Sequence, residues 1–249
     1  MSGNIPDKDK KELCLKSGNR CALPNCHRLL VVDDPDEDKN SVVAVMAHIQ
    51  GENPGSARYN DSYPKTDRNR YKNLIVVCPT CHKIIDDQEH IYTVEKLKKI
   101  KQEHEEWVNA SVREQVANVT FAELAEVMDY LSDGELDTPQ SLEVINPKNK
   151  IQKNNLSLQI ESLLVMGLTK VTQVKGYINS HPDMKFANRL VDGFVKEYNR
   201  LKYVEQIEAD ELFLELLEFS SNYKTEFKYK AAGLAVLSYL FEKCEVFEK

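Results

Sequence analysis

The chain has 249 residues, of which 41% are hydrophobic and 29% are charged, as in an ordinary globular protein with one large domain or two small ones. No apolar run approaches the roughly 20 residues of a membrane helix, and the N-terminus lacks an apolar signal core, so we expect a cytoplasmic protein with no membrane contact. Residues 1–110 carry 17 Lys and Arg against 18 Asp and Glu, whereas residues 111–249 carry 16 against 22. Any polyanion should therefore bind the first half of the chain.

The first half predicts a mixed α+β module. The expected elements are a helix over Asp7–Ser17, strands over Leu29–Val32, Ser41–Ile49 and Leu74–Val77, and helices over Cys81–Asp87 and Val94–Ala110. Thr93 is the expected N-cap of the last helix. The polar segment Gln50–Lys72 is a long loop, and loops of that length in compact domains are usually functional.

The second half predicts helices only. A helix over Phe121–Leu131 precedes a linker at roughly 132–150, where glycine and proline break the pattern, and apolar stripes of helical spacing run from Ile151 onward. No phosphate-binding glycine loop or Ser-His-Asp order appears there. We therefore expect three parts: a module over 1–110, a helix and linker over 111–150, and an all-helical domain over 151–249.

Two close cysteine pairs indicate a structural metal. Cys21 and Cys26 are separated by four residues, Cys78 and Cys81 by two, and each pair brackets a tight turn. Four thiolates so arranged can surround one Zn²⁺ tetrahedrally, although four unrelated buried thiols are the simpler alternative. Cys14 and Cys244 have no close partner in the sequence and are expected in apolar cores.

The segment between the two pairs contains His48 at a strand end and Asn73 before the next strand, and His82 directly follows the last cysteine. Because a zinc ion would clamp both ends of this segment, the three side chains can converge. Their order resembles that of the HNH endonucleases, the ββα-metal nuclease superfamily. The similarity covers residues from about 10 to 108 and is carried by Ala47–Ile49, Gly51–Tyr59, Asn73–Cys78 and His82–Asp86, which look like the HNH modules of bacterial anti-phage effectors.

The resemblance implies a zinc-bound ββα-metal nuclease module in which His48 is the general base for attack of water on a phosphodiester. An imidazole suits this task because its pKa lies near the working pH. His82 would bind a catalytic Mg²⁺ or Mn²⁺, and Asn73 would either bind that metal or brace the base histidine. The products would carry 5′-phosphate and 3′-hydroxyl ends.

One position departs from the pattern of many HNH enzymes, which place an Asp before the base histidine where this chain has Ala47. Asp86 lies one helical turn after His82 and can face the same metal. Glu52, Asp61, Asp67 or a water could instead supply the missing ligand, or the site is weakened. The simpler alternatives are a buried structural histidine at 48 and a solvated carboxylate at 86.

The long loop is the best local supply of cationic side chains. Five of them are candidates for contacts with the DNA backbone: Arg58, Lys65, Arg68, Arg70 and Lys72. Tyrosines are interleaved with them. The alternative is a solvated loop of mixed charge.

The helical domain has a second, less specific resemblance. Lys150–Leu156 and Ala231–Glu248 look like a C-terminal domain of bacterial ABC-three-component defence systems, in which a variable effector joins a small middle component and an SMC-like ATPase. The resemblance implies that residues 151–249 dock protein partners. Aromatics also cluster near the end of the chain, at Tyr239, Phe241 and Phe247, and large aromatics often anchor interfaces. A self-contained bundle or a homo-oligomer interface is the alternative.

Together these features predict a metal-dependent DNA endonuclease that serves as the effector of an anti-phage defence system. The competing interpretation is a catalytically silent, zinc-containing DNA-binding or scaffold module.

Overall fold

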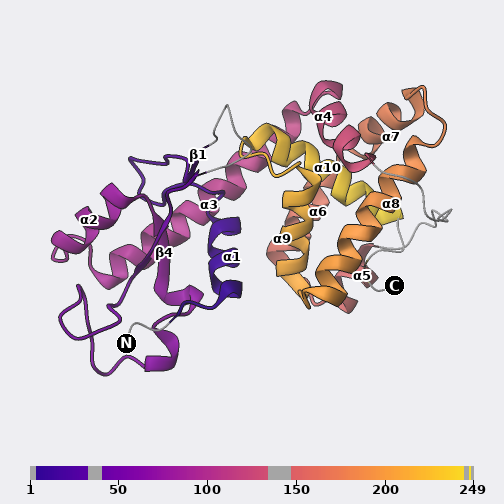
Figure 1. Cartoon of the computed structure of the whole chain (residues 1–249). Coiled ribbons are helices and arrows are strands. Elements are labelled where there is room, and N and C mark those ends of the chain that lie inside the picture. Colours follow the sequence, from indigo (N-terminus) through magenta and orange to yellow (C-terminus); the bar gives the residue numbers. More distant parts are fainter. Residues whose placement is uncertain (1–3, 33–40, 134–146, 244–246, 248–249) are drawn as a thin grey trace. The chain divides into compact units, whose positions relative to one another are not determined.

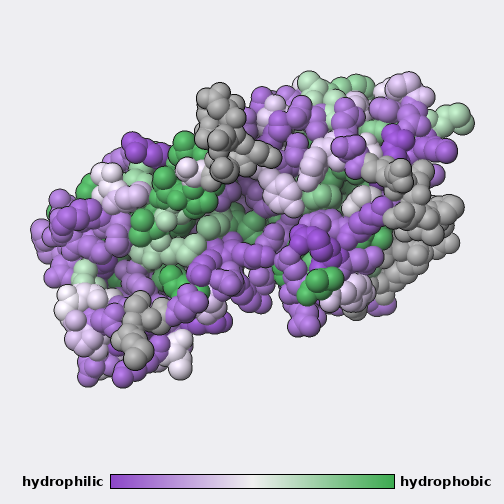
Figure 2. Space-filling model, viewed as in Figure 1, coloured by the Kyte–Doolittle hydropathy of each residue, from purple (hydrophilic) through white to green (hydrophobic). Residues whose placement is uncertain are grey.

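The computed structural model describes residues 4–32, 41–133, 147–243 and 247, which form two compact units, residues 1–109 and 110–249 (Figure 1). The first unit combines helices with short strands, and the second is helical. Among the described residues, no helix is both long and apolar enough to cross a membrane. In Figure 2, hydrophilic residues cover most of the visible surface of each unit, and hydrophobic residues gather in smaller groups over the strands of the first unit and over α4 of the second.

The first unit contains two small antiparallel sheets. Its elements are α1 (Asp7–Lys16), β1 (Val31–Val32), β2 (Ser41–Val42), β3 (Val45–His48), β4 (Leu74–Val77), α2 (Pro79–Asp87) and α3 (Val94–Asn118). Strand β1 pairs with β2, and β3 pairs with β4 in a register that sets His48 opposite Leu74. The residues of the predicted site therefore lie on or beside the antiparallel strands β3 and β4 and on helix α2, which follows β4 directly.

The predicted strand over Ser41–Ile49 is two strands rather than one. The backbone N–H of Val43 donates to the carbonyl of Leu30 at 2.8 Å, so the chain pairs with the β1 region before it turns into β3. Strand β4 is buried along its whole length and has the predicted bounds. The predicted cap of α3 is also confirmed, because the Thr93 hydroxyl accepts from the backbone N–H of Lys96 at 3.3 Å.

Helix α3 ends at Asn118, later than the predicted end at Ala110. Its later turns place Val112 and Val116 in the hydrophobic core of the second unit. These residues continue the apolar stripe at a spacing of four, so burial favours further helix where the local sequence alone suggested an end.

The long loop is folded around a buried arginine. Arg68 is 3% exposed, and its guanidinium donates to the carbonyls of Gly51 at 2.6 Å, Asn60 at 2.8 Å and Tyr63 at 2.9 Å. Gly51 is required for this arrangement, because a Cβ there would lie 2.6 Å from the carbonyl oxygen of Ala57. Two 3₁₀ turns, η1 (Lys65–Asp67) and η2 (Tyr71–Asn73), complete the loop. The hydrogen bonds from the Arg68 guanidinium thus hold together a polar segment that has few apolar side chains to bury.

The second unit is built around α10 (Phe227–Lys243), which is buried along most of its length and packs against α4, α6, α7 and α9 (Figure 1). The surrounding helices are α4 (Phe121–Leu131), α5 (Pro147–Lys153), α6 (Leu158–Leu168), α7 (Val171–Ser180), α8 (Phe186–Asn199) with its π turn η3 (Arg200–Val204), and α9 (Ala209–Ser220). The apolar stripes predicted from Ile151 onward supply its core. Helix α4 belongs to the same core, and most of the predicted linker, residues 134–146, lies outside the described residues.

Helices α6 and α10 approach closely because Gly167 of α6 lies where they meet. A Cβ added at Gly167 would lie 2.1 Å from the Ser238 hydroxyl oxygen and 2.7 Å from the Leu234 carbonyl oxygen. The aromatics near the chain end are also part of this core: Tyr239 is 7% exposed, Phe241 0% and Phe247 2%. The expectation that these three aromatics anchor a partner is therefore wrong, because packing within the unit already uses them.

Candidate metal centre and adjoining histidine site

The four predicted cysteines come together in the first unit. The sulfur atoms of Cys21, Cys26, Cys78 and Cys81 all lie within 4.8 Å of one another. The sulfurs of Cys26 and Cys78 are 3.9 Å apart. Three of the four side chains are buried and that of Cys26 is half-buried. Such a set of four sulfurs can hold a metal ion such as zinc, as the spacing predicted.

Two of these sulfurs accept hydrogen bonds from backbone N–H groups. The N–H of Cys78 donates to the sulfur of Cys21 at 3.3 Å, and the N–H of Cys81 donates to the sulfur of Cys78 at 3.5 Å. Burial raises the pKa of the Cys21 thiol to about 11 and raises the pKa of Cys81 as well. Buried thiols of high pKa are stable as thiolates only when a cation compensates their charge, which fits a metal. Cys14 is half-buried outside the cluster, and Cys244 lies outside the described residues.

His48 ends β3 on the long-loop side of the unit. Its Nε2 lies 2.7 Å from the side-chain oxygen of Asn69, a residue of the long loop that was not predicted as part of the site. Asn69 in turn donates through Nδ2 to Glu52 Oε1 at 2.8 Å. Nothing in the sequence distinguishes Asn69, which is a polar residue between two arginines in a polar loop.

Asn73 is buried, and its side-chain amide makes hydrogen bonds to backbone groups. Its Oδ1 accepts from the N–H of Gln50 at 2.9 Å, and its Nδ2 donates to the carbonyls of Gln50 and Arg68, both at 2.9 Å. In the structure it is therefore a loop clamp: the amide of Asn69, not that of Asn73, contacts the His48 imidazole. Asn73 fixes the chain just after β3 and acts on His48 through the backbone.

His82 and Asp86 face each other on α2, with Nε2 and Oδ2 separated by 3.2 Å. Both side chains remain partly exposed, at 39% and 37%. The other carboxylate oxygen of Asp86 accepts from Nη2 of Arg58 at 2.6 Å. This pairing confirms that the i, i+4 spacing brings the two side chains together, and it adds a cationic partner that the sequence did not reveal.

Arg58 connects the two histidines. Its side chain is 4% exposed, and besides Asp86 it donates to the carbonyls of His48 at 3.3 Å, Ile49 at 2.9 Å and Ile85 at 2.6 Å. One guanidinium thus joins the end of β3 to α2. The prediction that Arg58 contacts DNA is wrong, because its donors are spent inside the protein. The same prediction is wrong for Arg68, which is 3% exposed and donates through both terminal nitrogens to backbone carbonyls.

The remaining loop cations stay available. Lys65 and Lys72 are exposed, and Arg70 is half-exposed with Nη1 3.1 Å from Asp9 Oδ2. Of the alternative acidic ligands, Asp61 accepts from the Tyr59 hydroxyl at 2.9 Å and Asp67 accepts from Thr66 at 3.1 Å. Glu52 is the one that connects to His48, through Asn69.

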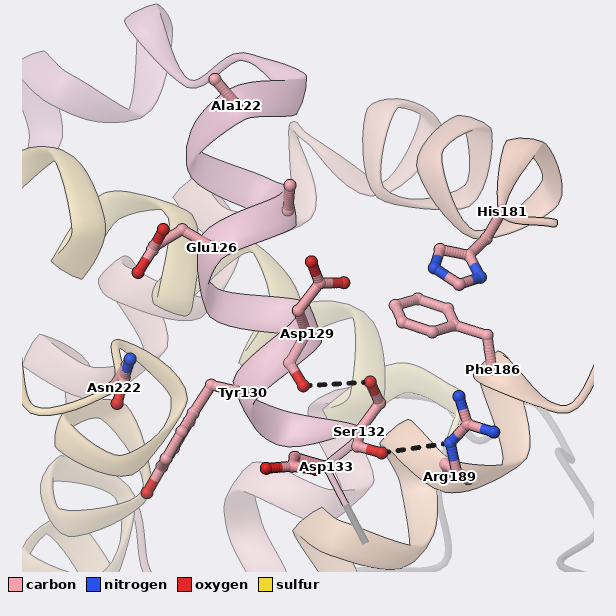
Figure 3. Close-up of a pocket in the computed structure, with 11 residues that line it drawn as sticks. Ala122, Glu126, Asp129, Tyr130, Ser132, Asp133, His181, Phe186, Arg189 and Asn222 are labelled. Atoms are coloured by element: carbon pink, nitrogen blue, oxygen red, sulfur yellow. Dashed lines mark hydrogen bonds between the residues drawn. The ribbon is translucent and has the colours of Figure 1, made fainter. Parts of the chain in front are cut away.

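The second unit carries a concavity of about 930 Å³ beside α4 (Figure 3). Its polar groups hold helix ends together: the Ser132 hydroxyl donates to the Asp129 carbonyl at 3.1 Å, and Arg189 Nε donates to the Ser132 carbonyl at 3.1 Å. His181 stacks on Phe186 with ring centroids 3.8 Å apart. The serine and the histidine of this concavity are therefore committed to structural contacts.

Comparison of the chain with protein-family models and with curated proteins finds no match.

Proposed function

We propose that this protein is a metal-dependent DNA endonuclease whose site comprises His48, His82 and Asp86. The observation that carries the proposal is the set of bonds made by Arg58. Its guanidinium binds the backbone of His48 and the carboxylate of Asp86, which faces His82. The two histidines named by the HNH resemblance therefore belong to one connected corner formed by β3, β4 and α2, beside the four-cysteine cluster.

The pair on α2 fits a divalent cation. Mg²⁺ holds its ligands at about 2.1 Å in octahedral geometry, so two adjacent ligands lie about 3 Å apart. Nε2 of His82 and Oδ2 of Asp86 are separated by 3.2 Å. Asp86 therefore suits the role of the carboxylate that Ala47 cannot supply. A bound Mg²⁺ or Mn²⁺ would supply positive charge for the scissile phosphate and the leaving 3′ oxygen.

The chain's own residues have distinct tasks in this proposal. His48 removes a proton from the attacking water. Arg58 keeps the His48 backbone and Asp86 at a fixed separation, and Asn73 fixes the loop after β3. Lys65, Arg70 and Lys72 contribute the positive surface that a DNA backbone requires.

The metal requirement is testable with supercoiled plasmid DNA. The wild type should nick and linearise plasmid when Mg²⁺ or Mn²⁺ is added, and excess chelator of divalent cations should stop the reaction. His82→Ala should weaken the catalytic metal, so high Mn²⁺ should restore part of the activity. A wild type that binds plasmid but leaves it intact under all these conditions would support the silent DNA-binding or scaffold module instead.

We further propose that the nuclease is a defence effector whose helical unit docks proteins encoded beside it, such as a small middle component or an SMC-like ATPase. The support is the resemblance of the terminal segments and two exposed apolar residues on α6, Leu158 at 83% and Val165 at 58%. They are seven residues apart and share a helix face. The double substitution Leu158→Asp with Val165→Asp should abolish capture of those partners, while Gln159→Asp on the same helix should not. Capture of none of these proteins by the wild type, with a dimer in solution, would favour self-association.

A further inference from the structure

The strongest unassigned feature is a chain of three side chains that ends on His48. Asn69 Oδ1 lies 2.7 Å from His48 Nε2, and Asn69 Nδ2 donates to Glu52 Oε1 at 2.8 Å. The second carboxylate oxygen of Glu52 accepts from Asn53 Nδ2 at 3.4 Å. We refer to Glu52, Asn69 and His48 as the relay.

The donors and acceptors in the hydrogen bonds of the relay can be assigned in only one way. A carboxylate only accepts hydrogen bonds, so Nδ2 of Asn69 must face Glu52. The opposite orientation of the amide would place its oxygen against a carboxylate oxygen with no proton between them. The amide oxygen therefore faces His48, and His48 Nε2 must be the donor.

This direction fixes the tautomer of the imidazole. A neutral imidazole carries one proton, and with that proton on Nε2 the lone pair is on Nδ1. Among the described residues, Nδ1 of His48 has no hydrogen-bond partner, so its lone pair is left to accept a proton. An imidazole with the wrong tautomer cannot act as a base at that atom.

We propose that Glu52 and Asn69 are positioning residues that hold His48 as the Nε2–H tautomer and direct Nδ1 to the attacking water. This inference rests on the proposed nuclease function. It assigns Glu52 to the base rather than to the catalytic metal, which His82 and Asp86 hold.

The main hydrogen bonds from loop side chains to the backbone do not involve the relay. The long loop is fixed by the guanidinium of Arg68 and the amide of Asn73, each of which makes three hydrogen bonds to backbone groups. Asn69 and Glu52 instead line a cavity of about 520 Å³ together with Tyr59, Lys65 and other loop residues. Changing these two side chains therefore removes none of the hydrogen bonds made by Arg68 and Asn73.

Five variants of the full chain separate the possibilities. Asn69→Ala removes the acceptor for Nε2, and Asn60→Ala, a matched change in the same loop, leaves the relay intact. Glu52→Gln keeps an oxygen that accepts from Asn69. The double variant Glu52→Gln with Asn69→Asp exchanges donor and acceptor between the two side chains and still leaves an acceptor facing Nε2. His48→Ala identifies the His48 signals in the ¹⁵N spectrum of histidine-labelled protein.

The wild type should show His48 as the Nε2–H tautomer, and Asn69→Ala should lose that preference. Asn69→Ala should lower the kcat for plasmid cleavage by at least about 10-fold. The loss should not exceed about 10⁴-fold, the upper limit of what a general base contributes. The KM for DNA and the zinc content should stay unchanged. Asn60→Ala should stay near the wild-type rate. Glu52→Gln should lose part of the rate, because a glutamine amide can donate as well as accept and no longer fixes the orientation of Asn69. The double variant should recover most of the rate.

The proposal is overturned if wild-type His48 carries its proton on Nδ1, or if Asn69→Ala cleaves as fast as Asn60→Ala. A large loss in Glu52→Gln that added Mn²⁺ reverses would assign Glu52 to the metal and also overturn it. If Asn69→Ala does not fold, the wild-type tautomer and the double variant decide. A wild type with the Nε2–H tautomer and no cleavage would confirm the hydrogen-bond relay and refute the nuclease.

Discussion

Nη2 of Arg58 lies 2.6 Å from Oδ1 of Asp86, although the two residues are 28 positions apart in the sequence. This ion pair ties the long loop to α2 and holds the carboxylate beside His82. The Arg58 side chain is 4% exposed, and the same guanidinium occupies three backbone carbonyls. Arg58 is therefore expected to stabilise the first unit as well as its site.

Arg58→Ala should destabilise the first unit by about 2–4 kcal/mol, because it leaves a carboxylate and three carbonyls without their donor. Urea unfolding followed by fluorescence of Trp107, the single tryptophan, reports on this unit. Lys83→Ala, which breaks the exposed pair with Asp87, is the control and should change stability by less than about 1 kcal/mol. Equal midpoints for the two variants would contradict the role assigned to Arg58.

The four-cysteine cluster should hold about one zinc ion per chain, as four close thiolates imply. Cys78→Ser should lose the metal and unfold the first unit more easily, because metal-binding free energy contributes to folding. Cys14→Ser, outside the cluster, should keep the metal. Elemental analysis of purified protein measures all three, and folded wild type without any bound metal would end this interpretation.

The surroundings of two helical glycines predict opposite outcomes for their replacement by alanine. Gly167→Ala should destabilise the second unit by about 1–3 kcal/mol, because its Cβ would meet the Ser238 side chain and the Leu234 backbone. Gly176→Ala on α7 meets only the Phe121 ring at 3.6 Å, an ordinary contact, and should stabilise the helix by about 0.5–1 kcal/mol. Thermal unfolding followed by circular dichroism distinguishes them. A destabilised Gly176→Ala with an unaffected Gly167→Ala would refute this packing.

Acid should destabilise the first unit through His104. Burial lowers the pKa of this histidine to about 4, below its usual value near 6.5, so the unfolded chain binds the proton more readily than the folded one. Above pH 6.5 the neutral His104 makes its full contribution to the free energy of unfolding. As the pH falls from about 6.5 towards 4, this contribution is lost, by an amount of the order of 3 kcal/mol.

The check is the urea midpoint at pH 5 and pH 7.5, measured for the wild type and for His104→Gln. Any loss of metal at low pH affects both proteins, so the difference between them isolates the histidine. The wild type should lose more stability than the variant between the two pH values, and equal losses would contradict the buried neutral state of His104.

Much of the scaffold around the site could be predicted because its signals are local. The apolar run Leu74–Val77 between polar segments predicted β4, and the spacing of Cys78 and Cys81 predicted the turn that brings two sulfurs together. The position of Asp86 one helical turn after His82 likewise predicted their contact. Each of these depends on residues close in sequence.

The errors concern residues whose partners are set by the three-dimensional path of the loop. Arg58 and Arg68 appear in the sequence as loop cations, but their hydrogen-bond acceptors are backbone carbonyls that converge only after the loop folds. Asn69 and Asn73 are four residues apart and chemically identical, and only the folded loop shows that Asn69 contacts the imidazole.

The central claim is tested most directly by the rate of plasmid cleavage, under enzyme excess with Mg²⁺ or Mn²⁺, for the wild type and His48→Ala purified in parallel. The account predicts that His48→Ala lowers the rate by at least about 10²-fold, the contribution expected of a general base, while zinc content and urea midpoint stay at the wild-type values. Cleavage by His48→Ala at the wild-type rate would contradict the account.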